Sequence, residues 1–380
     1  MNNQSYPKVM FINHFSVSGA TLLFSLFDSH PNVLIIPAFL DFPRFWKNNK
    51  LSESASFSEV VTCLSEWESL FEKRNNSQIQ NVGSNKDESI CIEDKAKFLG
   101  LLIENWNASY ISWPQLFFLV HDVYCQYRGV RTESITHIVC HPHGFENIHE
   151  MAESMPDSKV LHIIRDPRAA NYSYKRTCAK IERDMDVRQL LLGHKSELYF
   201  SYLPMRLFAI AKQRNYLDSE IAHKVIRFED LHINPTELMK DVANWMELNW
   251  DDSLMKSSFL GHPWGGNAVD GQPIYAFSRE KAESRLWLEG LSRIELVSYD
   301  FLCKRYLQKF EYDYVLEVSV LEAWTSIFKL YLLKLKQSTS ILIRYLSREN
   351  PNREAIVILR FILLEVRFPI AFLRYFIQSR

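Results

Sequence analysis

Short apolar runs alternate with segments of helical periodicity along most of the chain. Four runs have the length of a buried β-strand, namely residues 9–12, 33–36, 137–140 and 160–164. Apolar residues spaced three and four apart predict helices over 56–73, 95–106 and 115–127. The polar, turn-rich residues 74–91 predict a flexible surface loop. The pattern therefore predicts strands and helices that follow one another in alternation.

The first apolar run leads through a loop of small residues into a helical pattern that ends before Pro31. Such a loop directs unpaired backbone N–H groups at one point, which suits a phosphate. Gly19 would let the backbone approach an anion closely, and the hydroxyls of Ser18 and Thr21 would add donors. We interpret residues 18–21 as a phosphate-binding loop, although the strand, loop and helix of an ordinary α/β protein have the same pattern.

This loop departs from the pattern G-x-x-x-x-G-K-[ST] of the nucleotide hydrolases. Gly19 and Thr21 fit the pattern, whereas His14 stands in place of the first glycine and Ala20 in place of the lysine. The loop therefore lacks the lysine that ATP and GTP hydrolysis uses.

A second informative stretch follows the apolar run 160–164. Asp166 can cap a helix whose first residue is Pro167, where a missing N–H costs nothing. Arg165 then lies at the carboxyl end of a strand, where open α/β sheets bind ligands, and Ser173 lies two helical turns further on. A guanidinium and a hydroxyl placed in this way could bind a second phosphate together.

With these two motifs in place, the chain resembles the sulfotransferases that use 3′-phosphoadenosine 5′-phosphosulfate. Residues 16–23 (SVSGATLL) are similar to that family's 5′-phosphosulfate loop, often P-R-S-G-T-T-L-L, and its D-x-H-P continuation follows as residues 28–31. The 3′-phosphate motif of the family has an arginine and a serine eight residues apart, as Arg165 and Ser173 are. Three later stretches, 155–159, 225–235 and 285–292, match further family motifs in order.

The resemblance covers about residues 8–314 and implies a single α/β domain with a central parallel sheet flanked by helices, related to P-loop nucleotide-binding folds. It implies transfer of a sulfuryl group from 3′-phosphoadenosine 5′-phosphosulfate to a hydroxyl or amine of a small molecule, carbohydrate or lipid. Ser18, Gly19, Ala20 and Thr21 would bind the 5′-phosphosulfate, Arg165 and Ser173 the 3′-phosphate, and Arg285 would assist.

Departures from the family concern the chemical step. Val17 stands where the family has a lysine or arginine before S-G, and Pro37-Ala38 stands where many relatives have a glutamate that takes the acceptor's proton. The nearest carboxylate is that of Asp41, and His14 or His141 could transfer a proton at neutral pH. We name these three as the candidate catalytic residues. The alternative is a nucleotide-binding or membrane-associated interaction protein that kept the fold and lost turnover.

Composition excludes several partner classes. A net charge of −1 on 380 residues gives no reason to expect a nucleic acid. The six cysteines are scattered without a C-x-x-C pair, which argues against a disulfide framework or a cysteine zinc site and favours a reducing compartment. His141 and His143 have no recognisable partner ligands for a metal, so we expect no metal site.

The sequence has neither a signal pattern nor a long apolar run, so we expect a cytoplasmic protein.

The composition changes at the end of the chain, and we expect a sulfotransferase-like domain over 1–316 and a basic, apolar helical tail over 317–380. Residues 319–380 contain ten basic and four acidic residues. Arginines recur every seven residues, at 353, 360, 367 and 374, within a mostly apolar segment. This pattern is typical of a helix in peripheral contact with a membrane. The alternative is a helical pair, 321–347 with 352–378, that buries its apolar faces within the protein or in a homodimer.

Overall fold

The computed structural model describes residues 6–14, 17–71, 82, 92–142, 147–155, 157–184, 220–266 and 277–346. By internal contacts the chain divides into two units. Unit 1 comprises Met1–His14, Ser18–Ile164 and Glu220–Glu283, and unit 2 comprises Phe15–Val17, Arg165–Ser219 and Ser284–Arg380. The loop expected over 74–91 lies outside the described residues except for Val82, and the tail helix expected over 352–378 lies outside them entirely.

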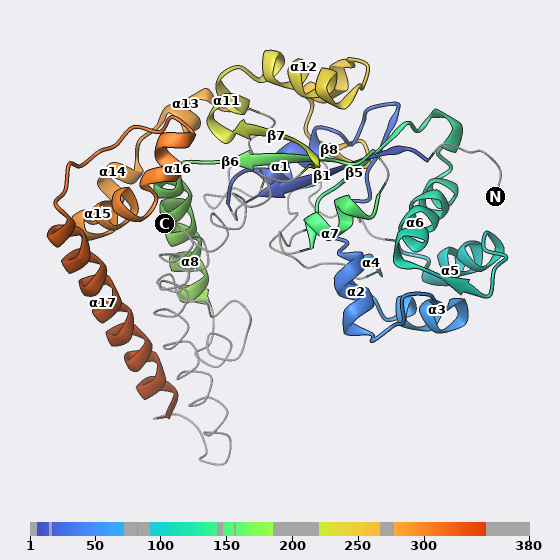
Figure 1. Cartoon of the computed structure of the whole chain (residues 1–380), viewed down its shortest axis with the longest axis horizontal. Helices are drawn as coiled ribbons and strands as arrows, with labels where there is room; N and C mark the ends of the chain where they lie inside the picture. Colours follow the sequence, from blue (N-terminus) through green and yellow to red (C-terminus); the bar gives the residue numbers. More distant parts are fainter. Residues whose placement is uncertain are drawn as a thin grey trace. The chain divides into compact units, whose positions relative to one another are not determined.

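Unit 1 contains a five-stranded parallel sheet with the strand order β2-β5-β1-β6-β7 (Figure 1). Its strands are β1 (Lys8–His14), β2 (Val33–Leu34), β5 (His137–Cys140), β6 (Lys159–Ile164) and β7 (Ala222–Arg227). The four strands expected from apolar runs are confirmed. The fifth, β7, pairs only with β6 at the edge of the sheet, and its partly exposed residues therefore lack a continuous apolar run.

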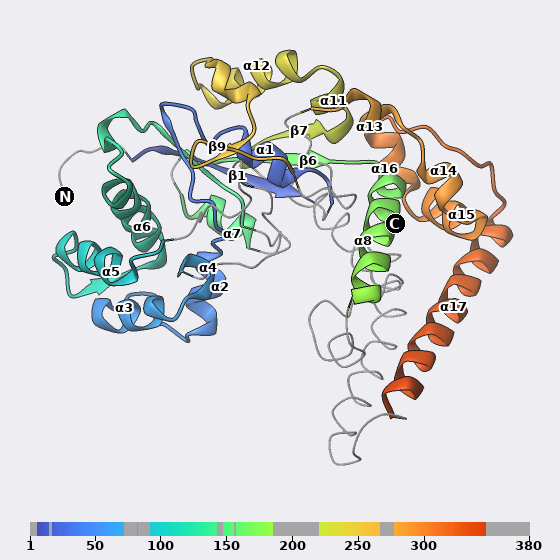
Figure 2. The ribbon, with the colours of Figure 1, turned by 180° about the vertical axis from the view of Figure 1, so that it is seen from behind.

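Helices cover both faces of this sheet. Successive residues of β1 point to opposite faces, and the four residues 9–12 are all apolar. Val9 and Phe11 belong to one buried cluster, and Met10 and Ile12 to the other. Figures 1 and 2 show α12 on the opposite side of the sheet from α2, α5 and α6. The α/β fold with a central parallel sheet, which the resemblance implied, is thus confirmed.

The three helices expected over 56–73, 95–106 and 115–127 are all present in unit 1. The helix expected over 56–73 is divided into α3 and α4, and those expected over 95–106 and 115–127 are α5 and α6. The helices are α1 (Ala20–Ser25), α2 (Phe42–Asn48), α3 (Phe57–Ser65), α4 (Glu68–Phe71), α5 (Lys95–Glu104), α6 (Trp113–Arg128), α7 (Ile148–Glu153), α11 (Phe228–Ile233), α12 (Pro235–Met246) and α13 (Arg279–Glu283). Short elements are β3 (Ala55–Ser56), β4 (Tyr110–Ile111), η1 (Thr132–Ser134), η2 (Asp252–Met255), β8 (Ser258–Phe259) and β9 (His262–Pro263).

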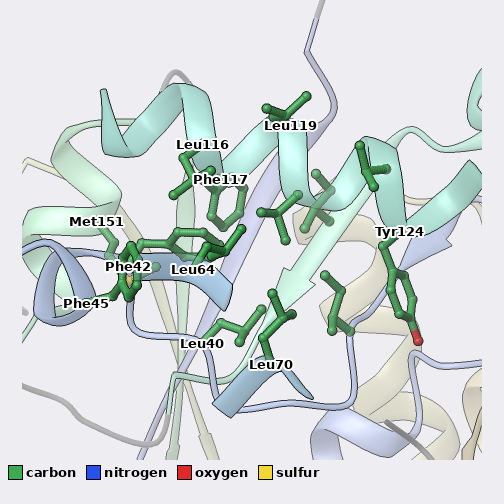
Figure 3. Close-up of a cluster of buried hydrophobic side chains, with 14 of the residues drawn as sticks. Leu40, Phe42, Phe45, Leu64, Leu70, Leu116, Phe117, Leu119, Tyr124 and Met151 are labelled. Carbon is green, nitrogen blue, oxygen red and sulfur yellow. The ribbon is translucent and has the colours of Figure 1, made fainter. Parts of the chain in front are cut away.

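An aromatic cluster fills the space between the sheet and helices α2 to α7. Figure 3 shows Phe42 of α2 beside Phe117 of α6, with Leu64 and Leu116 near them. The rings of Phe42 and Phe117 lie 5.3 Å apart at a steep angle, a favourable edge-to-face arrangement. This core keeps α2 and α6 against the sheet.

The described helices of unit 2 are α8 (Pro167–Asp184), α14 (Trp287–Gly290), α15 (Arg293–Leu302), α16 (Lys304–Lys309) and α17 (Val320–Leu346). Helices α14 and α15 pack against α8, and α17 packs along α15 (Figure 2). The first tail helix, expected over 321–347, is therefore present as α17.

Two histidines of unit 1, His121 and His162, are deeply buried, and we expect them to make its stability sensitive to acid. Burial lowers the pKa of His121 to about 4, although its Nδ1 lies 2.7 Å from the carbonyl oxygen of Phe117. Burial, together with His223, lowers the pKa of His162 to about 3. Since the unfolded chain binds these protons at a higher pH than the folded protein does, their contribution to stability is complete above pH 6.5 and is lost as the pH falls toward 4.

We therefore expect the free energy of unfolding to fall by about 1.4 kcal/mol per pH unit for each such histidine below pH 6.5. Urea unfolding at a series of pH values measures this slope. His121→Gln should flatten it, whereas His262→Gln, at an exposed position, should not. An unchanged slope in His121→Gln would contradict the assignment.

Candidate active site

The predicted phosphate loop lies at the carboxyl end of β1. Val17 and Gly19 both have left-handed backbone conformations, with φ of 63° and 85°, on either side of the buried Ser18. Ala20 and Thr21 are the first two residues of α1, and no side chain caps the N-terminus of that helix. The backbone turns sharply here and leads its N–H groups into the start of α1, as the sequence predicted.

Glycine is the residue type that fits position 19 of this turn without strain. A Cβ atom on Gly19 would lie 2.5 Å from Cδ2 and 2.8 Å from Cε2 of Phe228, the first residue of α11. The positive φ adds a second constraint, because a side chain in that conformation approaches the backbone closely. Sequence reasoning did not name Phe228 as a site residue, because its contact with Gly19 joins two distant segments of the chain.

Two of the three candidate catalytic residues are brought together by the strand order. His14 ends β1 and His141 follows β5, which pairs with β1. Their ring centroids lie 4.7 Å apart in an edge-to-face arrangement. The ring of Phe39 lies 5.0 Å and that of Phe24 5.7 Å from the ring of His141. The pair is therefore buried among aromatic rings beside the start of the phosphate loop.

Asp41, the third candidate, caps helix α2. Its Oδ1 accepts a hydrogen bond from the backbone N–H of Arg44 at 3.0 Å, and Nδ2 of Asn147 donates to both carboxylate oxygens. Burial raises the pKa of Asp41 above its usual value, partly offset by these hydrogen bonds. The carboxylate of Asp41 therefore caps α2 and holds Asn147, and its part in proton transfer stays a prediction.

Arg165 follows β6 directly, and β6 is the neighbour of β1 in the sheet. His14 pairs with Ile163 in the register of these strands, so both chains leave the sheet at the same edge. Nη1 of Arg165 donates a hydrogen bond of 2.9 Å to the carbonyl oxygen of Val17, the residue before Ser18. The guanidinium predicted for the 3′-phosphate therefore contacts the residue that precedes Ser18 in the chain.

A buried arginine that sequence reasoning missed lies on the first turn of α8. Arg168 is 1% exposed and bonds to both oxygens of Asp166, to Oδ1 of Asp300 at 2.7 Å and to the carbonyl oxygen of Asp313 at 2.7 Å. Its guanidinium also lies 4.4 Å from the ring centroid of Trp287. This network connects α8 to α14, α15 and the segment after α16.

The remaining predicted site residues lie in the same unit as Arg165. Ser173 is half-buried on the second turn of α8. Arg285 is exposed, and its Nη2 donates to a carboxylate oxygen of Asp313 at 2.7 Å. Asp313 therefore contacts Arg285 through its side chain and Arg168 through its backbone carbonyl. No three histidine, cysteine or acidic residues lie close enough to hold a metal ion in the described part of the chain, and His143 lies outside that part.

One protein family and several solved structures are similar to this chain. A family model described as "Sulfotransferase family" matches residues 11–252. No curated protein matches the chain. Among solved structures, the sulfotransferase domain from the curacin biosynthetic pathway is similar, with 14% identity, a TM-score of 0.48, and coverage of 82% of this chain and 100% of that one. The sulfotransferase domain of the Synechococcus PCC 7002 olefin synthase has 16% identity, a TM-score of 0.46, and coverage of 82% and 97%. Retinol dehydratase in a complex with retinol and PAP has 12% identity, a TM-score of 0.31, and coverage of 84% and 85%.

Proposed function

Because the chain belongs to the sulfotransferase family, we propose that it transfers a sulfuryl group from 3′-phosphoadenosine 5′-phosphosulfate to a hydroxyl or amine. One observation carries the proposal: the phosphate loop and Arg165 follow neighbouring strands of one sheet, and Arg165 bonds to the carbonyl oxygen of Val17. Phosphate ligands bind at this edge of open α/β sheets.

The donor's phosphates would contact both motifs. Backbone N–H groups and hydroxyls of residues 18–21 would bind the 5′-phosphosulfate, and Gly19 leaves the backbone accessible where a side chain would clash. Arg165 and Ser173 would bind the 3′-phosphate, with Arg285 assisting from its exposed position. No metal is needed for this binding scheme.

The chemical step needs positive charge and a proton acceptor. The bond from sulfur to the phosphate oxygen breaks, a bond from sulfur to the acceptor's oxygen or nitrogen forms, and the acceptor loses a proton. Val17 brings no charge, so we assign stabilisation of the leaving 5′-phosphate to the N–H groups of residues 18–21. His14 or His141 would take the proton, since both lie at the end of the strands that precede the site.

A second function is favoured by the same residues. Val17 instead of a basic residue, together with the capping role of Asp41, fits a protein that binds the nucleotide without turning it over. Transfer of labelled sulfate from the donor to a panel of hydroxyl and amine acceptors distinguishes the two functions. Nucleotide binding without any transfer would favour the second, and a gain of transfer in Val17→Arg would indicate an enzyme that lost its cation.

Nucleotide binding itself is tested with adenosine 3′,5′-bisphosphate by titration calorimetry. We expect Arg165→Ala to weaken binding about tenfold or more, because a charged hydrogen bond to a phosphate is lost. Arg131→Ala, a change at an exposed arginine after α6, serves as the matched control and should leave the affinity unchanged. If the unaltered protein did not bind the nucleotide, both proposed functions would be wrong.

A further inference from the structure

Helix α17 has two apolar faces, and within the described part of the chain only one of them is packed. Ala323, Ile327 and Leu330 are 0–6% exposed on the face that packs within unit 2. The neighbouring face is open: Leu321 is 75%, Phe328 60% and Leu332 47% exposed. Soluble proteins rarely leave large apolar side chains exposed in one group, so this face requires an explanation.

The exposed residues form one continuous stripe. Positions 321, 324, 328 and 332 are three or four residues apart and therefore lie above one another along the helix. Trp324, 38% exposed, lies in the middle of the stripe, and its ring centroid is 6.2 Å from that of Phe301 on α15. An aromatic anchor held against a neighbouring helix gives the stripe a fixed geometry.

Positively charged side chains lie beside this stripe on α17. Lys329 and Lys336 are exposed, and their positions on the helix border the stripe on one side. Over residues 319–380 the sequence has ten basic and four acidic residues, while the chain as a whole has a net charge of −1. A second copy of the same segment would repel this charge, whereas an anionic surface would attract it.

We propose that the stripe formed by Leu321, Trp324, Phe328 and Leu332 binds the interface of a lipid bilayer that contains anionic lipids. The helix would lie along the surface, with its aromatic and leucine side chains among the acyl chains and its lysines at the headgroups. Among the described helices, none is long and apolar enough to cross a membrane.

Vesicle flotation with the full chain tests this proposal. Vesicles of phosphatidylcholine alone are compared with vesicles that also contain phosphatidylglycerol. We expect the protein to float with the anionic vesicles, and the bound fraction to fall as salt is raised because the lysines are screened. Leu321→Glu/Phe328→Glu should lower vesicle affinity about tenfold or more, because two apolar contacts are lost and two negative charges are added.

The matched control places the same charges on other exposed apolar residues. Ile103→Glu/Tyr110→Glu changes side chains that are 54% and 62% exposed in unit 1, and it should float like the unaltered protein. Lys329→Gln/Lys336→Gln removes charge without touching the apolar residues and should weaken binding to anionic vesicles only. This second variant keeps the test decisive if the glutamate variant fails to fold.

Three results would overturn the proposal. One is an unaltered protein that does not float with anionic vesicles, and another is equal flotation of the unaltered protein and both α17 variants. The third is a concentration-dependent dimer in sedimentation, lost in the glutamate variant and accompanied by no vesicle binding, since the stripe would then be an interface between two copies.

Discussion

Replacing Arg168 by methionine is expected to lower the free energy of unfolding by about 3–5 kcal/mol, because two buried carboxylates lose their partner. The guanidinium is 1% exposed and bonds to Asp166, Asp300 and the carbonyl oxygen of Asp313. Burial opposes the charge of Arg168, yet the hydrogen bonds and charges of Asp166 and Asp300 raise its pKa above the usual value. Chemical unfolding at pH 7 measures the loss.

Arg285→Met is the matched control, because that arginine also pairs with Asp313 but is 57% exposed. An exposed ion pair contributes at most about 1 kcal/mol, so this variant should remain close to the unaltered protein. In addition, Asp300→Asn should restore part of the stability lost in Arg168→Met, since it removes one unpaired charge. Equal effects of the two arginine variants would contradict the role of the buried network.

Gly19→Ala is expected to weaken binding of adenosine 3′,5′-bisphosphate about tenfold or more, because an alanine in a left-handed conformation is strained and the loop must move. The new Cβ would meet the ring of Phe228 at 2.5 Å, so either that ring or the loop has to shift. Calorimetric titration of the folded variant measures the affinity, and sulfate transfer should fall with it.

A second glycine, Gly129, separates the effect of conformational strain from that of the clash with Phe228. Gly129 has a φ of 68°, and a Cβ there would meet nothing within 4 Å, so Gly129→Ala carries the conformational strain without a clash. It should lower stability and leave nucleotide affinity unchanged. Phe228→Leu in the Gly19→Ala background should restore part of the affinity. Normal nucleotide binding by Gly19→Ala would show that the loop does not contact the phosphates.

Local patterns sufficed for most strands of the sheet, and for locating the turn at Gly19 and the strand end at Arg165. Continuous apolar runs predicted β1, β5 and β6, because strands buried on both faces need apolar residues at every position. Gly19 and Arg165 were found because a turn and a strand end depend on a few adjacent residues. The edge strand β7 was missed, since it is only partly buried.

Contacts between distant segments were decided by the tertiary structure alone. The strand order brings His14 beside His141, although the sequence named each only as a separate candidate. Phe228 against Gly19, and Asp300 with Asp313 around Arg168, have no local signal at all. The physical reason is that periodicity and turn chemistry act over a few residues, whereas the pairing of remote side chains depends on how the strands are ordered and where the helices pack.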